Sequence, residues 1–255
     1  MKQLLILSLS FLLTLPLFAK PEVTLVKYIW NNGSKYIGEW KDDRMQGHGT
    51  YTYGKGKWQG EQYVGEFNNG YRNGHGTYSW LNGDKYVGEF KADKPNGHGT
   101  YSWSDGRIYS GEFKDGIRTG QGRLTWNGGE QYEGAFRAGT MSGHGTFSWP
   151  GGNKYVGEFE GGFRNGLGTY RWAKGEEYTG EFKHGFRNGL GTYTWPNGNK
   201  YQGFWINGII SGQGTFTFKD GTVWEGEFLQ ETLWNGTVFD TNGKIVASFL
   251  NGEKQ

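Results

Sequence analysis

Cysteine is absent from this chain of 255 residues. Its absence excludes disulfide bridges and metal sites built on thiolates. An excess of one charge sign is also lacking, since the formal net charge is only +2 at pH 7. A nearly neutral chain exerts no long-range attraction on nucleic acid or on an anionic membrane. No stretch shows the periodicity of an amphipathic helix, which argues against folds that alternate strands with helices.

Long apolar runs are scarce, and the one that exists lies at the N-terminus. Residues 4–18 are apolar apart from two serines and a threonine; Lys2 precedes them and the small Ala19 follows. The run is shorter than the roughly 20 residues that span a bilayer. The pattern is typical of a secretory signal peptide over residues 1–19, with an uncleaved N-terminal anchor as the alternative. We therefore expect an exported protein, either periplasmic, envelope-associated or secreted, with a short linker at residues 20–25.

Glycine and aromatic residues are plentiful, and they recur at a fixed spacing. The chain holds 48 glycines, and 18% of its residues are aromatic. An aromatic anchor, followed by x-Gly-Glu-Phe or a near variant, stands at Tyr36, Tyr63, Tyr86, Tyr109, Tyr132, Tyr155, Tyr178, Tyr201 and Trp224. The first spacing is 63 − 36 = 27 residues, and the later ones are 23, as in 86 − 63 = 23. Such a period indicates a serial array of one structural unit.

Each unit predicts a β-hairpin. With the anchor counted as position 0, positions 0, 2 and 4 are tyrosine, glycine and phenylalanine or tryptophan, an alternation typical of a strand with one aromatic face. Positions 13 to 17 read Gly-Thr-Tyr-x-Trp and predict the second strand. A loop such as residues 68–75 joins the two strands, and a turn such as residues 81–85 leads to the next hairpin.

The predicted fold class is all-β: an elongated single-layer antiparallel sheet of tandem β-hairpin repeats, twisted or curved, with about 20 strands. The array covers residues 26–249, beginning with a half unit and ending in a degenerate cap, and residues 250–255 form a tail. The four extra residues of the first spacing are expected in an enlarged turn around Gly54 to Gln59.

The sequence also suggests a pairing register. We expect each strand glycine to face a large ring, Gly65 opposite Tyr78, because a glycine partner leaves room for a ring to lie flat. Tyr63 would then face Trp80. In this register one face carries an unbroken aromatic row, the predicted binding surface, made of Tyr63, Trp80, Tyr86, Trp103, Tyr109, Trp126, Tyr132, Trp149, Tyr155, Trp172, Tyr178, Trp195 and Tyr201.

The YxGEF anchor, the GxGTY segment and the closing Asn-Gly turn, at a period of 23 residues, resemble MORN repeats over nearly all of residues 26–249. The departures are glutamate replaced at Ala135 and Phe204, second-strand tyrosine replaced at Leu124 and Phe147, and the anchor replaced at Trp224. The resemblance implies an elongated sheet of hairpins. It also implies roles in protein–protein contact, scaffolding, dimerisation or binding to membranes and phosphoinositides.

Histidine recurs at position 12 of the repeat, and glutamate recurs at position 3. The histidines are His48, His75, His98 and His144. Equivalent positions in neighbouring repeats lie two strands apart, about 9.6 Å, which is too far for one metal ion. The glutamates are Glu39, Glu66, Glu89, Glu112, Glu158, Glu181 and Glu227, and we expect them to pair with nearby lysines or threonines. No catalytic residue, metal site or cofactor is predicted, and the protein is not expected to be an enzyme.

Arginine recurs at position 9, in the expected loop, at Arg72, Arg118, Arg164 and Arg187. Four basic tips along one edge could contact anionic phospholipid. The favoured interpretation is that they are solvated loop tips, because uncharged residues such as Met45 and Pro95 interrupt the row.

The aromatic face is the strongest candidate for function, because a single-layer sheet has no second layer to cover it. Three interpretations compete. The first is binding of a protein partner or of a second copy. The second is binding of carbohydrate or cell wall, since stacked rings suit the faces of sugars. The third is a purely structural role. We predict a non-enzymatic interaction scaffold.

Overall fold

The computed structural model describes residues 5–6 and 24–255, and all regular structure in these residues is β. The predicted signal peptide and most of the linker lie outside the described residues. The exception is β1 (Leu5–Ile6), which pairs antiparallel with Lys27 and Val26. Within the described part of the chain, no helix is long and apolar enough to cross a membrane.

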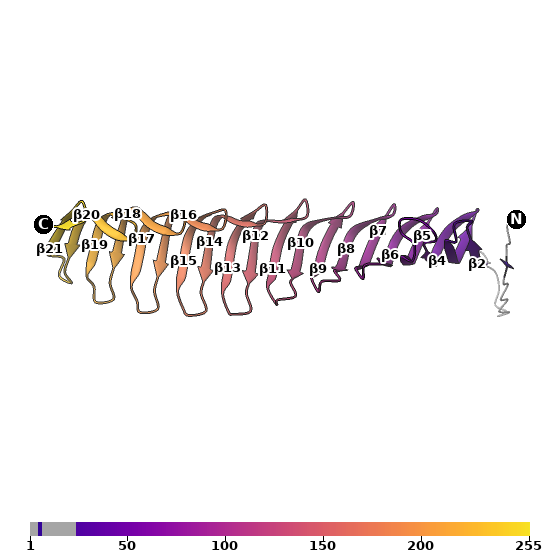
Figure 1. The fold of residues 1–255 in the computed structure, drawn as a ribbon, viewed down its shortest axis with the longest axis horizontal. Helices are drawn as coiled ribbons and strands as arrows, with labels where there is room; N and C mark the ends of the chain where they lie inside the picture. Colours follow the sequence, from indigo (N-terminus) through magenta and orange to yellow (C-terminus); the bar gives the residue numbers. More distant parts are fainter. Residues whose placement is uncertain (1–4, 7–23) are drawn as a thin grey trace, which may run out of the picture. The chain divides into compact units, whose positions relative to one another are not determined.

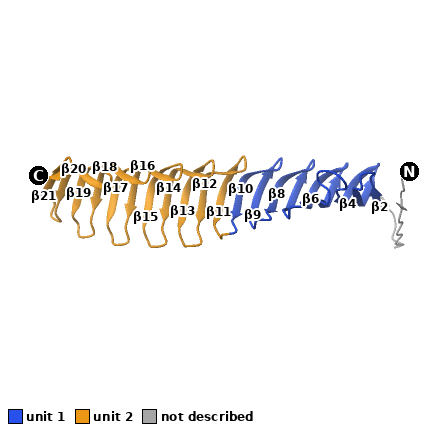
Figure 2. Cartoon of the chain, viewed as in Figure 1, with its two compact units in different colours: residues 1–127 blue, residues 128–255 orange. Residues whose placement is uncertain are grey.

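The chain divides into two compact units, residues 1–127 and residues 128–255 (Figure 2). After β1, unit 1 contains β2 (Thr24–Ile29), β3 (Lys35–Lys41), β4 (Arg44–Thr52), β5 (Gln62–Asn68), β6 (Tyr71–Ser79), β7 (Lys85–Lys91), β8 (Lys94–Ser102), β9 (Ile108–Lys114) and β10 (Ile117–Thr125). Unit 2 contains β11 (Gln131–Arg137), β12 (Thr140–Ser148), β13 (Lys154–Glu160), β14 (Phe163–Arg171), β15 (Glu177–Lys183), β16 (Phe186–Thr194), β17 (Lys200–Ile206), β18 (Ile209–Thr217), β19 (Val223–Leu229), β20 (Thr232–Phe239), β21 (Ile245–Leu250) and β22 (Glu253–Lys254).

Within each unit, every strand pairs antiparallel with the next one along the chain, as in β5 with β6 and β6 with β7. The strands therefore follow one another in chain order (Figure 1). The predicted fold class, an antiparallel sheet of tandem hairpins without helices, is confirmed. At the end of the array, Leu250 and Phe249 pair with Glu253 and Lys254, so the predicted tail folds back as a short strand.

The predicted register is wrong by two residues. Tyr63 lies opposite Tyr78, and Gly65 lies opposite Gly76. Two facing glycines clear a trough that is wide enough for a whole ring, and Tyr63 fills it. A Cβ atom on Gly76 would lie only 2.3 Å from the Tyr63 hydroxyl oxygen. The glycines therefore make room for the anchor of their own repeat, and not for the aromatic residue on the facing strand.

The loop predicted at residues 68–75 is also wrong, because most of it is strand. Asn69 and Gly70 form a two-residue turn with φ angles of 51° and 86°, the geometry of a type I′ hairpin turn. Next, a bulge places one residue of β5 opposite three residues of β6, since Gly65 pairs with Gly76 and Phe67 pairs with Arg72. Arg72 lies on the same face as the aromatic rings, and the bulge places it opposite Phe67.

The enlarged turn of the first repeat is confirmed. The Tyr53 amide donates to the Glu61 carbonyl at 3.0 Å, and the Gly60 amide donates back to the Tyr53 carbonyl at 3.0 Å. The four extra residues are accommodated in the loop between these two bonds. The loop projects the indole of Trp58, which is 52% exposed.

The anchor tyrosines form a buried inner ladder along each unit. Tyr36, Tyr63, Tyr86, Tyr109, Tyr132, Tyr155, Tyr178 and Tyr201 are each 0% exposed. Within a unit, an anchor ring packs between the phenylalanine or tryptophan at position 4 of its own repeat and that of the next, as Tyr63 does edge-to-face with Phe67 and Phe90, both at 5.0 Å between centroids. Edge-to-face pairs of this kind are worth about 0.5–1.5 kcal/mol beyond burial. The inner ladder is the core of a sheet that has no second layer.

Candidate functional site

An outer ladder of rings runs beside the inner one. It consists of the aromatic residues at positions 15 and 17 of each repeat. In unit 1, Trp80 lies 4.6 Å from Tyr78 and 5.1 Å from Tyr101, between ring centroids. In unit 2, Trp172 lies 4.4 Å from Tyr170 and 5.3 Å from Tyr193. These tryptophans are half-buried, so the outer ladder presents ring surface to solvent.

The predicted aromatic row therefore divides into two sets. Its tyrosines belong to the inner ladder and are fully buried, so a partner cannot reach them: Tyr63, Tyr86, Tyr109, Tyr132, Tyr155, Tyr178 and Tyr201. Its tryptophans are half-buried: Trp80, Trp103, Trp126, Trp149, Trp172 and Trp195. The cause is the two-residue error in register, which had placed each anchor beside the tryptophan of its own hairpin. A binding role for the tryptophans stays a prediction.

The position-9 arginines are not solvated loop tips. The bulge turns them across the ring faces, where the Arg164 guanidinium lies 5.0 Å from the Tyr170 ring and the Arg187 guanidinium 4.1 Å from the Trp205 ring. Arg72 and Arg118 stack in the same way on rings of unit 1. Burial lowers the pKa of the unit 2 guanidiniums and of Arg118. The prediction of lipid contact assumed that these guanidiniums project into solvent from loops. In the structure they lie on the faces of aromatic rings instead.

Unit 1 contains an aromatic groove of about 530 Å³. This volume is within the usual range of ligand pockets, roughly 300–1,000 Å³. The groove lies between the outer ladder and the position-9 side chains, and it is lined by Trp30, Met45, Tyr51, Tyr53, Trp58, Phe67, Gly70, Arg72, Tyr78, Trp80, Phe90, Asp93 and Pro95. Three tryptophans and three tyrosines among these residues make it a site for flat or apolar ligand groups.

The enlarged turn helps to form the groove. Tyr53 stands where the next six repeats have tryptophan, and its ring lies 6.0 Å from Trp58 and 6.0 Å from Tyr78. Neither Tyr53 nor Trp58 was among the predicted site residues. The longer first spacing was the available signal, because a turn lengthened beside an aromatic surface adds side chains to it.

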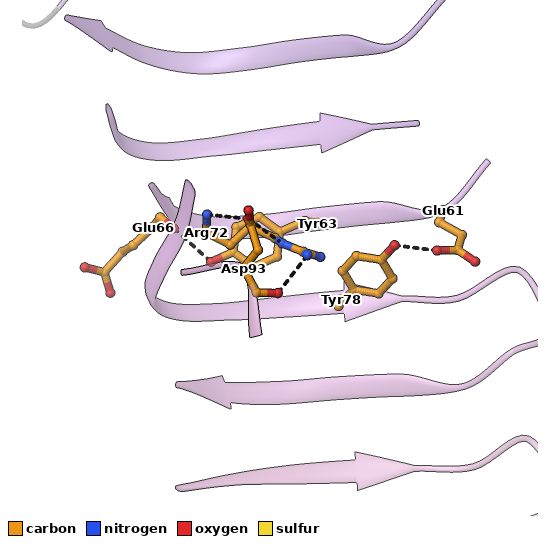
Figure 3. A network of polar contacts seen from close by, with 6 residues as sticks. All are labelled: Glu61, Tyr63, Glu66, Arg72, Tyr78 and Asp93. Atoms are coloured by element: carbon orange, nitrogen blue, oxygen red, sulfur yellow. Dashed lines mark hydrogen bonds and ion pairs between the residues drawn. The ribbon is translucent and has the colours of Figure 1, made fainter. Parts of the chain in front are cut away.

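A closed ion pair lies in the groove (Figure 3). The backbone amide and Nε of Arg72 donate to Asp93 Oδ1 at 2.9 and 3.1 Å, and Nη2 donates to the Asp93 carbonyl at 2.8 Å. The same guanidinium lies 4.9 Å from the centre of the Tyr78 ring. The Arg72 side chain is 18% exposed and that of Asp93 is 44% exposed. The groove therefore contains both charges but has no net charge from them.

A buried carboxylate holds the outer ladder in place. The Tyr78 hydroxyl donates to the Glu61 carboxylate, which is 8% exposed (Figure 3). Burial, and then this hydrogen bond, raise the pKa of Tyr78. In the next repeat Tyr101 donates to Asp84 Oδ2 at 2.8 Å in the same way. These carboxylates orient rings and are not free to act as acids or bases on a ligand.

Unit 2 has smaller hollows at the equivalent place. The two cavities measure about 240 and 160 Å³, and Arg164 lines both. Its guanidinium donates to the Gly185 carbonyl at 2.7 Å. Arg187 lines the larger of these two hollows together with Arg164.

The glutamate row has a different partner from the one expected. Instead of lysine or threonine, Glu66 accepts the backbone amide of His75 across the bulge at 2.8 Å. Glu89 does the same for His98 at 2.7 Å. The histidine side chains themselves are exposed. Among the described residues, no group of three or more side chains is placed to hold a metal ion.

Comparison with known proteins identifies the repeat. A family model described as MORN repeat matches residues 36–58, 63–85, 86–106, 109–131, 132–154, 155–177, 178–200 and 201–223. Among curated proteins, none matches the chain.

Similar solved structures are distant. The SAS-4 (dCPAP) TCP domain of Drosophila melanogaster, solved with a proline-rich motif of Ana2 (dSTIL), is 15% identical, with 77% of this chain and 99% of that chain covered and a TM-score of 0.38. The G-box domain of the microcephaly protein CPAP is 13% identical, with coverages of 90% and 96% and a TM-score of 0.34. A streptogramin B lyase is 13% identical, with coverages of 92% and 79% and a TM-score of 0.16.

Proposed function

The chain belongs to the MORN repeat family, and from this we propose that it is a non-enzymatic scaffold that binds a protein partner. The contact surface is the aromatic groove of unit 1, which includes the outer-ladder tryptophan Trp80. One observation supports this most directly: the groove of about 530 Å³ is lined largely by aromatic side chains. Tyrosine and tryptophan in such pockets dominate the energy of protein interfaces.

The groove is formed in the absence of a partner, which favours binding. Its rings pack on one another at 4.6 to 6.0 Å, and the carboxylate of Glu61 fixes the Tyr78 hydroxyl. A preformed surface saves the cost of ordering side chains on association, about 0.5–1.5 kcal/mol for each one. A second copy of this chain could also be the protein partner, and the experiment below distinguishes it from a different protein.

The proposed setting is the cell envelope or the extracellular space, on the strength of the N-terminal pattern of residues 1–19. Carbohydrate binding is the second candidate, because the half-buried tryptophans of the outer ladder could stack on sugar rings. Binding of anionic phospholipid is weaker, since the guanidiniums that would make it lie on ring faces.

The test is affinity capture of partners by the full chain, with a tag at its C-terminus, from the envelope and medium of the cells that make it. Trp80→Ala removes a groove residue, and Trp172→Ala removes the equivalent residue of unit 2. We expect Trp80→Ala to weaken capture at least about 30-fold, the loss of a 2 kcal/mol hot spot, and Trp172→Ala to leave it unchanged.

Controls separate the outcomes of this capture. Circular dichroism confirms that both variants keep their strands, and light scattering reports whether the captured partner is a second copy. The intact mass of the isolated chain shows whether residues 1–19 have been removed. Capture that is equally strong with the wild-type chain and with Trp80→Ala would refute the groove as the contact surface.

A further inference from the structure

The groove has a repeat distance that a ligand can match. Its rings recur once in each hairpin repeat, and a repeat is two strands wide, about 9.6 Å. A polyproline II helix makes one turn in three residues of about 3.1 Å each, close to 9.3 Å. An extended β-strand returns to the same side after only about 6.6–6.8 Å. A polyproline II segment that runs across the strands therefore meets equivalent rings with the same side of every turn.

The chemistry of the groove fits the same ligand. Because Arg72 and Asp93 neutralise each other, the groove offers no net charge to an anionic or a cationic group. Proline has an apolar ring and a carbonyl acceptor but no backbone N–H. The indoles of Trp30, Trp58 and Trp80 line the groove, and each carries an N–H donor. Ligand carbonyls can accept from these donors while the proline rings pack on the aromatic faces.

A sugar chain fits less well. Its hydroxyl groups both donate and accept, and they need several polar side chains at fixed positions. The charged side chains that line the groove are Arg72 and Asp93, which already bond to each other. Glu61, next to the groove, is committed to Tyr78.

We infer that the aromatic groove of unit 1 binds a neutral, proline-rich peptide segment in the polyproline II conformation, with a proline or apolar residue at every third position. The segment lies across β2 to β8, between the outer ladder and Met45, Arg72 and Pro95. This inference rests on the proposed function, of which it names the partner class.

The probes are a synthetic polyproline peptide, a glycine–serine peptide of equal length, and soluble cell-wall oligosaccharides. Each is titrated into the full chain, and binding is measured by calorimetry and by the indole N–H resonances of the tryptophans. We expect polyproline to bind, to shift those resonances, and to bind more tightly than the other two probes.

Two variants locate the site. Trp58→Ala changes only the enlarged turn, outside the strand pairing, so it tests the groove without disturbing the sheet. We expect it to weaken polyproline binding at least about 10-fold, while Trp172→Ala in unit 2 has no effect. Equal binding of the polyproline and glycine–serine peptides, or preferential binding of the oligosaccharides, would overturn the inference.

The two proposals can fail separately. If polyproline does not bind but Trp80→Ala still abolishes capture of a cellular partner, the proline-rich ligand is wrong and the groove remains the contact surface. If capture is insensitive to Trp80→Ala, the proposed function fails whatever the peptides do.

Discussion

Units 1 and 2 are built on the same inner ladder but differ in what covers it. The Tyr63 and Phe90 rings are 5.0 Å apart in unit 1, and Tyr155 and Phe182 are also 5.0 Å apart in unit 2. The cavities beside the ladder differ more than twofold, at about 530 Å³ against 240 and 160 Å³. The inner positions thus fix the hairpin, and the larger groove lies in unit 1, where the enlarged turn adds Trp58 to the lining.

The opposite face differs as well. In unit 1 it carries exposed histidine and glutamate, as in His75 and Glu66. In unit 2 the equivalent positions include Leu167, Leu190 and Phe204, which are 60%, 53% and 45% exposed. Two units with one scaffold therefore present surfaces of different chemistry on both sides, which is what a scaffold with more than one contact requires.

The largest expected effect is unfolding of the protein at alkaline pH, and we expect it in both units. Burial raises the pKa to about 12 for Tyr109 in unit 1 and for Tyr132, Tyr155 and Tyr201 in unit 2. The ordinary value is about 10. The raised pKa means that the neutral phenol stabilises the fold, fully below pH 10, and that this stability is lost as pH rises from 10 through 12.

Tyrosinate absorbance and far-ultraviolet circular dichroism, recorded together from pH 8 to pH 13, check this expectation. We expect the strands to melt as the inner tyrosines ionise. High salt serves as the control for general charge repulsion, because screening should not protect a buried phenol. Ionisation of all tyrosines near pH 10 with the strands intact would contradict the inner ladder in either unit.

The next effect comes from filling the trough beneath an anchor ring. A Cβ atom on Gly76 would lie 2.3 Å from the Tyr63 hydroxyl oxygen, and one on Gly168 would lie 2.3 Å from that of Tyr155. The rings cannot move aside because phenylalanines hold both edges. We expect Gly76→Ala and Gly168→Ala each to destabilise the protein by about 3 kcal/mol, the upper end for overpacking.

Urea unfolding, with hydrogen exchange to localise the damage, measures both substitutions. Gly151→Ala is the control, because a Cβ atom there meets nothing within 4 Å. A large loss in one unit and a small one in the other would break the claim that the two inner ladders are equivalent.

The repeat, the hairpin and the enlarged turn follow from the sequence because each depends on local pattern. Alternation from Tyr63 to Phe67 predicts a strand, and the 27-residue first spacing places the extra residues in a turn. The register does not follow. It depends on whether a glycine pairs with a ring or with another glycine, and both choices satisfy the same alternation.

The candidate site could be predicted only in part for the same reason. The tryptophans of the outer ladder were among the predicted residues, but the bulge inserts two extra residues into one strand and sets Arg72 opposite Phe67. Composition gives no sign of that bulge. Trp58 was missed because it lies in the enlarged turn of the first repeat, a position that does not recur in the later repeats.

The smallest expected effect concerns the glutamate whose carboxylate accepts a backbone amide at the bulge. Removing this glutamate in unit 1 and introducing one at the equivalent position of unit 2 should have opposite effects on stability. In unit 1, Glu66 accepts the His75 amide at 2.8 Å, whereas in unit 2 the same position is Ala135, which offers no carboxylate to the His144 amide. A Cβ atom on Gly143 would lie 3.6 Å from that of Ala135, so a longer side chain has room. We expect Ala135→Glu to stabilise the protein by about 1 kcal/mol and Glu66→Ala to destabilise it by the same amount, the net value of one hydrogen bond.

Hydrogen exchange of the two histidine amides measures this directly, and Ala135→Gln should give a smaller gain because an uncharged acceptor bonds more weakly. If protection of the His144 amide does not rise in Ala135→Glu, the carboxylate does not cap the bulge, and the difference between the units at this position has no consequence for stability.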